Sequence, residues 1–152
     1  MSKLKSAREL ILKVLFQIEV GKLPPDEALE TSFEQVRPSP EDRAYVDEVV
    51  RGVVAETEEL DAIIGSLAEG WRLDRLAKVD KNVLRTALYE LRHQPAAPVS
   101  VVVNDAVDVA KKYSTEDSGR FVNGILGSFL RGRNPDGAVE DAGEDEIEVG
   151  AL

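Results

Sequence analysis

Apolar residues recur at steps of three and four along almost the whole chain, from Ala7 to Leu130. This spacing gathers them on one face of an α-helix, whereas a half-buried strand would show strict alternation. The segment VSVVV at residues 99–103 could form a strand if taken alone, but its continuation NDAVDVAKKY keeps the helical spacing. No stretch alternates convincingly with a period of two. The sequence therefore predicts an all-α protein.

Start and stop signals divide this pattern into about seven helices. Ser6 and Glu9 have the spacing of a capping box at the first helix. Ser39, followed by Pro40, is a good N-cap for the third helix, and Asp80 is expected to cap the fifth. The second, fourth, sixth and seventh helices are expected at about residues 25–36, 57–69, 99–113 and 115–131.

The last predicted helix contains three glycines, Gly119, Gly124 and Gly127. Each glycine in a helix interior costs about 1 kcal/mol relative to alanine, so a compensating reason is needed. Gly124 and Gly127 lie on a small-residue edge beside an apolar stripe that includes Phe121 and Ile125. We expect another helix to come close there. Gly119 falls in the first turn, which we expect to be exposed.

The residue types disfavour an enzyme or a metal centre. The chain has no cysteine, which excludes disulfides and thiolate metal sites, and it has a single histidine. That histidine, His93, lies at a predicted helix end, where a cation is favourable for the helix dipole. No glycine-rich phosphate loop is present, and most carboxylates fall on outward faces of helices. We expect no catalytic residues, no metal and no cofactor.

Charge is unevenly distributed along the chain. Residues 134–152 contain seven acidic residues and no Lys or Arg, so residues 1–133 carry only −3 of the formal net charge of −10. We expect a helical domain over residues 1–133 and a disordered acidic tail over residues 134–152. Near the N-terminus, residues 1–13 hold four cations against Glu9 alone, which allows a basic patch.

No apolar run approaches the roughly 18 residues of a membrane span, and the N-terminal residues show no secretory cleavage signal. We therefore expect a cytoplasmic protein that does not enter a membrane.

Three segments carry a resemblance to a known family. They are ARELILKVLFQIE near the N-terminus, VDKNVLRTALYELR in the fifth predicted helix, and PVSVVVNDAVDVAKKYSTEDSGRFVNGIL after it. In sequence, order and spacing they resemble the NusB family of bacterial transcription antitermination factors, and the resemblance covers residues 6–131. It implies two packed helical bundles.

The resemblance also implies a function. Members of this family bind the boxA element of nascent RNA together with NusE, a ribosomal protein of the small subunit. The complex joins RNA polymerase and suppresses termination, notably in ribosomal RNA operons. Carried over residue by residue, the implied RNA face consists of Lys3, Lys5, Arg8, Lys13, Phe16, Asp117, Arg120 and Phe121. Asp80 and Lys81 match the start of the fifth helix, where the family meets RNA or NusE.

Two other functions are compatible with the sequence. Family members often carry an arginine cluster where this chain has KLKSAR, and lysine makes fewer bidentate phosphate contacts than arginine. The chain could therefore be a helical protein-interaction adaptor or a homodimer with little RNA binding of its own. An RNA-modifying enzyme is disfavoured, because a methyltransferase fold would need more chain and a glycine-rich cofactor loop.

Overall fold

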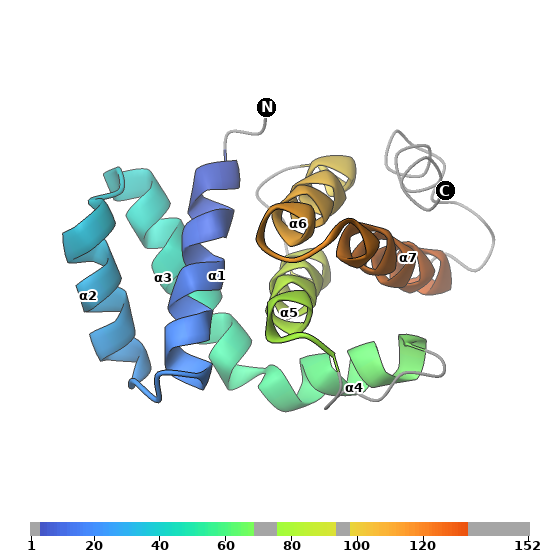
Figure 1. The fold of residues 1–152 in the computed structure, drawn as a ribbon, viewed down its shortest axis with the longest axis horizontal. Helices are drawn as coiled ribbons and strands as arrows, with labels where there is room; N and C mark the ends of the chain where they lie inside the picture. Colours follow the sequence, from blue (N-terminus) through green and yellow to red (C-terminus); the bar gives the residue numbers. More distant parts are fainter. Residues whose placement is uncertain (1–3, 69–75, 94–97, 134–152) are drawn as a thin grey trace.

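The computed structural model describes residues 4–68, 76–93 and 98–133 (Figure 1). In these ranges the chain forms seven helices and no strand, as the periodicity predicts. The helices are α1 (Lys5–Glu19), α2 (Pro25–Val36), α3 (Pro40–Ala55), α4 (Thr57–Leu67), α5 (Lys78–Arg92), α6 (Val99–Tyr113) and α7 (Glu116–Arg133). No helix within these ranges is both long and apolar enough to cross a bilayer. Lys3 and the predicted acidic tail lie outside the described residues.

The helices form two packed groups, which confirms the two-bundle prediction. Helices α1, α2 and α3 contact one another, and α4 to α7 form the second group around α5. In Figure 1, α1 stands between α2 and α3 on one side and α5, α6 and α7 on the other. Because α1 also contacts α5 and α6, and α3 contacts α5, the two groups share one core.

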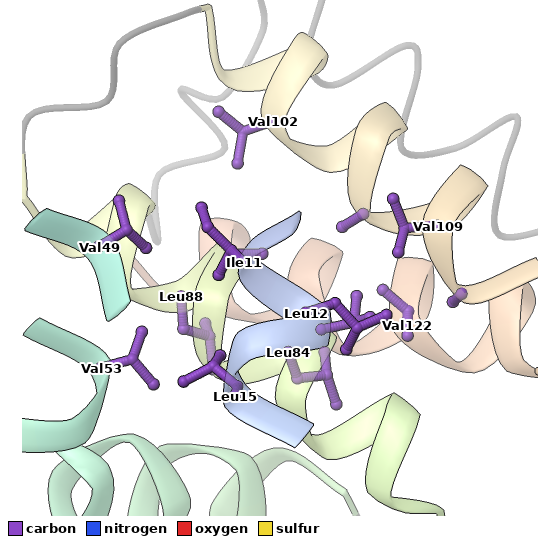
Figure 2. Close-up of a cluster of buried hydrophobic side chains, with 14 of the residues drawn as sticks. Ile11, Leu12, Leu15, Val49, Val53, Leu84, Leu88, Val102, Val109 and Val122 are labelled. Atoms are coloured by element: carbon purple, nitrogen blue, oxygen red, sulfur yellow. The ribbon is translucent and has the colours of Figure 1, made fainter. Parts of the chain in front are cut away.

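The shared core is aliphatic. Figure 2 shows that the labelled side chains of α1 point toward those of α3, α5 and α6. Ile11, Leu84 and Leu88 are completely buried at the centre of this cluster. Burial of one such side chain contributes about 1.5–3 kcal/mol, so the seam between the bundles is a major source of stability.

One predicted helix start is confirmed and two are wrong. The hydroxyl oxygen of Ser39 accepts a hydrogen bond from the Asp42 N–H at 3.1 Å, as an N-cap should. Helix α1 instead begins after Leu4, and no side chain caps it, so Ser6 lies inside the first turn. Helix α5 begins after Ala77, and Asp80 lies within its first turn. Asp80 accepts a hydrogen bond from Ser118 on α7, so a tertiary contact replaces the predicted local cap.

The close helix approach predicted at Gly124 is not found, while the prediction for Gly127 stays a prediction. A Cβ atom added at Gly124 would meet no atom within 4 Å, so that prediction is wrong. A Cβ added at Gly52 on α3 would overlap the ring of Tyr89 on α5, so the side chain of a neighbouring helix occupies the space beside this glycine. The prediction that Gly119 is exposed is also wrong, because it is buried beneath the side chain of Lys111.

Candidate nucleic-acid interface

Helices α1 and α6 lie side by side and are joined by charged pairs. Within each helix the paired residues lie on one side, because Lys5 or Asp108 is three and four positions from the other two. The pairs are Arg8–Asp105 at 2.6 Å, Lys5–Asp108 at 3.3 Å and Glu9–Lys112 at 3.2 Å. We call this contact the α1–α6 seam. The Arg8 pair is buried, whereas the other two lie toward the surface.

The buried pair belongs to a larger polar network. The guanidinium of Arg8 donates to both carboxylate oxygens of Glu90, at 2.9 and 2.7 Å, and to Asp105. The hydroxyl of Tyr45 also contacts Glu90, so the network joins α1, α3, α5 and α6. Burial by itself would lower the pKa of Arg8, but the adjacent carboxylates outweigh it and raise that pKa above its usual value.

This network corrects the placement of Arg8. The sequence resemblance puts Arg8 on the RNA face, but the side chain is only 5% exposed and its guanidinium is held by two carboxylates. A phosphate could reach it only if the core opened. Arg8 therefore fixes the position of α1. Its neighbours Lys5 and Glu9 form the ion pairs on the outer side of the α1–α6 seam.

Aromatic and cationic side chains gather where α1 meets the end of α6. The ammonium groups of Lys13 and Lys112 lie 5.9 and 5.4 Å from the ring centre of Tyr113, within cation–π range. Phe16 is 42% exposed, which is high for a phenylalanine. These residues border a hollow of about 320 Å³, lined by Leu12, Lys13, Phe16, Gln17, Val79 and Tyr113.

A second hollow lies on the other side of the first turn of α5. Its volume is about 310 Å³, and its lining residues are Leu76, Ala77, Asp80, Thr115, Asp117, Ser118 and Phe121. Val79 lines the first hollow and the next residue, Asp80, lines the second, so the start of α5 is the ridge between them. Both volumes fall at the lower end of the range of ligand pockets, about 300–1,000 Å³.

Asp80 is a buried carboxylate at the base of this ridge. It is 8% exposed, and one of its oxygens accepts from the Ser118 hydroxyl at 3.1 Å. Burial raises the pKa of Asp80, and hydrogen bonds from Ser118 and Ser114 offset part of this effect. Asp80 thus ties the start of α5 to the start of α7, and both residues of this contact line the second hollow. Its neighbour Lys81 is mostly buried and lies 3.7 Å from Glu19.

The first turn of α7 supplies the charged rim of the second hollow. Arg120 donates to Asp117 at 3.1 Å, and both side chains are largely exposed. Phe121 is half-buried against the hollow. Within the described residues, no group of three or more potential ligands could hold a metal ion.

The structure brings most of the predicted RNA-face residues to one surface, formed by α1, the start of α5, the end of α6 and the start of α7. Lys13 and Phe16 line the first hollow, and Asp117 and Phe121 line the second. Sequence reasoning missed Lys112 and Tyr113. The signal was present as KKY, an aromatic residue directly after two lysines at a helix end.

Exposed aromatic rings beside ammonium groups are suited to single-stranded nucleic acid. Bases stack on aromatic rings, and cations contact the phosphates between them.

Comparison with known proteins identifies the family. The family model for NusB matches residues 5–131. The chain belongs to the NusB family. This NusB-family chain is 42% identical to the transcription antitermination protein NusB of Desulforamulus reducens over 126 residues, 83% of this chain and 88% of that protein. It is 45% identical to the NusB of Desulforudis audaxviator over 128 residues, 84% of this chain and 93% of that protein.

Solved NusB structures share the fold. The crystal structure of T. maritima NusB matches with a TM-score of 0.78 at 31% identity, over 97% of this chain and 99% of that one. A crystal structure of antitermination factors NusB and NusE in complex with dsRNA matches with a TM-score of 0.75 at 30% identity. That match covers 84% of this chain and 96% of the other. The all-α, two-bundle fold is therefore the NusB fold.

Proposed function

We propose that this chain is a transcription antitermination factor that binds boxA-type single-stranded RNA together with NusE. In this role it supports transcription of ribosomal RNA as part of the antitermination complex on RNA polymerase. The observation that carries the proposal is the likeness, over 84% of the chain, to the solved complex of antitermination factors NusB and NusE with dsRNA. The many relatives of about 40% identity that are named as antitermination proteins support it.

The surface described above gives each residue a part in this function. Phe16, Tyr113 and Phe121 stack on bases, while Lys13 and Arg120 contact phosphates. NusE meets the start of α5, next to Asp80 and Lys81. Binding of this kind needs no catalytic group or cofactor, so the factor acts without enzymatic activity. It works in the cytoplasm, where nascent transcripts are made.

We assign this function to residues 1–133. Residues 134–152 are then an acidic extension of the RNA-binding domain, and Lys3, by its charge, belongs to the proposed set of RNA-binding residues.

RNA binding with and without NusE tests the proposal. We expect the full chain and NusE together to bind a short boxA-type single strand more tightly than a shuffled strand of the same composition. A duplex of the same sequence is measured alongside, because the similar solved complex of NusB and NusE contains dsRNA. If the chain binds NusE but no RNA in either mixture, it is a protein-interaction adaptor. Light scattering would show whether it is also a homodimer.

Phe16→Ala tests the stacking surface directly. Stacking of one base on an aromatic ring is worth about 1–3 kcal/mol, and the variant should lose RNA affinity by that amount. Val36→Ala is the matched control, because Val36 is a 52% exposed apolar residue on α2, away from this surface. Fluorescence anisotropy with labelled RNA measures both. Equal affinities of the two variants would contradict the assignment of Phe16.

A further inference from the structure

Four cations at the proposed RNA surface are paired with carboxylates. Lys5, Lys111, Lys112 and Arg120 each lie within 3.6 Å of an acidic side chain. Those acidic partners are, in the same order, Asp108, Glu116, Glu9 and Asp117. Four positive and four negative charges therefore cancel on the face where phosphates would bind.

We propose that Asp108 is a built-in competitor of RNA phosphate, which holds Lys5 until a specific complex displaces it. The inference rests on the function proposed above and adds a residue that limits binding. By neutralising Lys5, Asp108 lowers the affinity for any RNA backbone. Tight binding then depends on base stacking and on NusE, which a random transcript does not supply together.

Exposure separates Asp108 from Glu9, whereas Glu116 and Asp117 are more exposed still, at 72% and 89%. Asp108 differs from Asp117 because its pair with Lys5 joins α1 to α6, while Asp117 pairs with Arg120 within one helix. The side chain of Asp108 is 50% exposed and that of Lys5 is 25% exposed, so the pair lies at the surface and adds little stability. Phosphate can replace such a carboxylate at small cost. Glu9 is different, since it is only 18% exposed and also accepts a hydrogen bond from the Tyr113 hydroxyl at 2.9 Å. Glu9 therefore holds Tyr113 in place as well.

The exchange also predicts the response to salt. A free lysine that binds a phosphate releases a condensed counterion, which gives a slope of about −0.7 in log K against log salt for single strands. When the lysine comes from an ion pair, the displaced carboxylate attracts cations from solution. The two effects oppose each other, so the salt dependence of the wild-type chain should be shallow.

Asp108→Asn tests the inference in the full chain, with Glu34→Gln as the matched control. Each substitution removes one negative charge, but Glu34 is an exposed residue of α2, which packs on α1 and α3. At low salt we expect Asp108→Asn to tighten binding of unrelated single-stranded RNA by about three- to tenfold and to steepen the salt slope by up to about 0.7. Glu34→Gln should leave both nearly unchanged. Melting temperatures of all variants are measured alongside.

Removal of Lys5 completes the test. In a double-mutant cycle, Lys5→Ala should abolish the gain that Asp108→Asn produces, because the gain passes through the freed ammonium group. An equal gain from Asp108→Asn and Glu34→Gln would reduce the effect to net charge and overturn the inference. A gain that persists without Lys5 would also overturn it. If the wild type and Asp108→Asn bind no RNA at low salt, even with NusE, the proposed function itself fails.

Discussion

The buried and the exposed ion pairs of the α1–α6 seam are made from the same kinds of residue but have different roles. Arg8 and Asp105 are each 5% exposed, whereas Lys5 and Asp108, one turn away, are 25% and 50% exposed. Removal of one partner from a buried pair costs about 3–5 kcal/mol, because the other charge is stranded. An exposed pair is worth about 0–1 kcal/mol, because water and salt replace the partner.

This comparison separates residues that stabilise the fold from residues that are proposed to bind RNA, although both kinds lie within one helical turn. The buried pair fixes α1 against α5 and α6, and therefore fixes the surface on which Phe16 and Lys13 lie. The exposed pair can exchange its carboxylate for a phosphate without loss of the fold. The proposed RNA surface thus carries replaceable ion pairs, while the buried network beneath it keeps the helices in place.

The largest effect is expected for Arg8→Met. The substitution leaves Glu90 and Asp105 buried without their common cation, so the free energy of unfolding should fall by about 3–5 kcal/mol. Urea denaturation followed by circular dichroism measures the change. Lys5→Met on the same helix is the control. If both substitutions lower the free energy of unfolding by the same amount, the buried Arg8–Asp105 pair contributes no more to stability than the exposed pair.

A pair of glycine substitutions should change stability in opposite directions. At Gly52, alanine would overlap the Tyr89 ring, and overpacking costs about 1–3 kcal/mol, more than the gain in helix propensity. At Gly124 the space is open, so Gly124→Ala should raise stability by about 0.5–1 kcal/mol. Thermal melts of the two variants decide the matter. Destabilisation by Gly124→Ala would instead support the close helix approach at Gly124 that the sequence predicts.

Asp80→Asn should alter the pH dependence of stability. Burial raises the pKa of Asp80 in the folded state above its unfolded value, which is about 3.9. Asp80 therefore contributes most to stability below that value, and this contribution is lost as pH rises through the folded-state pKa. Asparagine cannot ionise, so the variant should gain stability relative to the wild type between about pH 4 and pH 7. Urea denaturation at both pH values measures this, and a difference independent of pH would contradict it.

The smallest effect on stability is expected for Lys5→Met. The pair with Asp108 is partly exposed, so its loss should cost less than about 1 kcal/mol. RNA affinity should nevertheless fall at low salt, because one phosphate contact disappears. The fall should shrink as salt rises, since screening weakens the same contact in the wild type. A large loss of stability with unchanged RNA affinity would show that Lys5 stabilises the fold and does not contact RNA.

Much of the fold could be predicted from the sequence. The periodicity placed α2 and α6 at residues 25–36 and 99–113, and it resolved VSVVV as helix. Helix starts were harder to predict, because a cap is a local signal that a tertiary contact can override. The carboxylate of Asp80 has the right chemistry for a cap, yet it bonds to Ser118, thirty-eight residues further along. The predicted site residues Lys13, Phe16, Asp117 and Phe121 line two neighbouring hollows, whereas Arg8 is buried, and the RNA-binding role of this surface stays a prediction.

The sequence by itself determined that this chain is all-α, that it has about seven helices and that it resembles the NusB family, because helix periodicity and motif spacing are properties of neighbouring residues. Tertiary structure alone decided which cation is buried and which glycine meets another helix. Lys5 and Arg8 lie three residues apart in one basic segment. Only Arg8 faces Glu90 and Asp105, which come from 82 and 97 residues away. Solvent exposure and the charge of distant neighbours are set by packing, so no local pattern could have told the two residues apart.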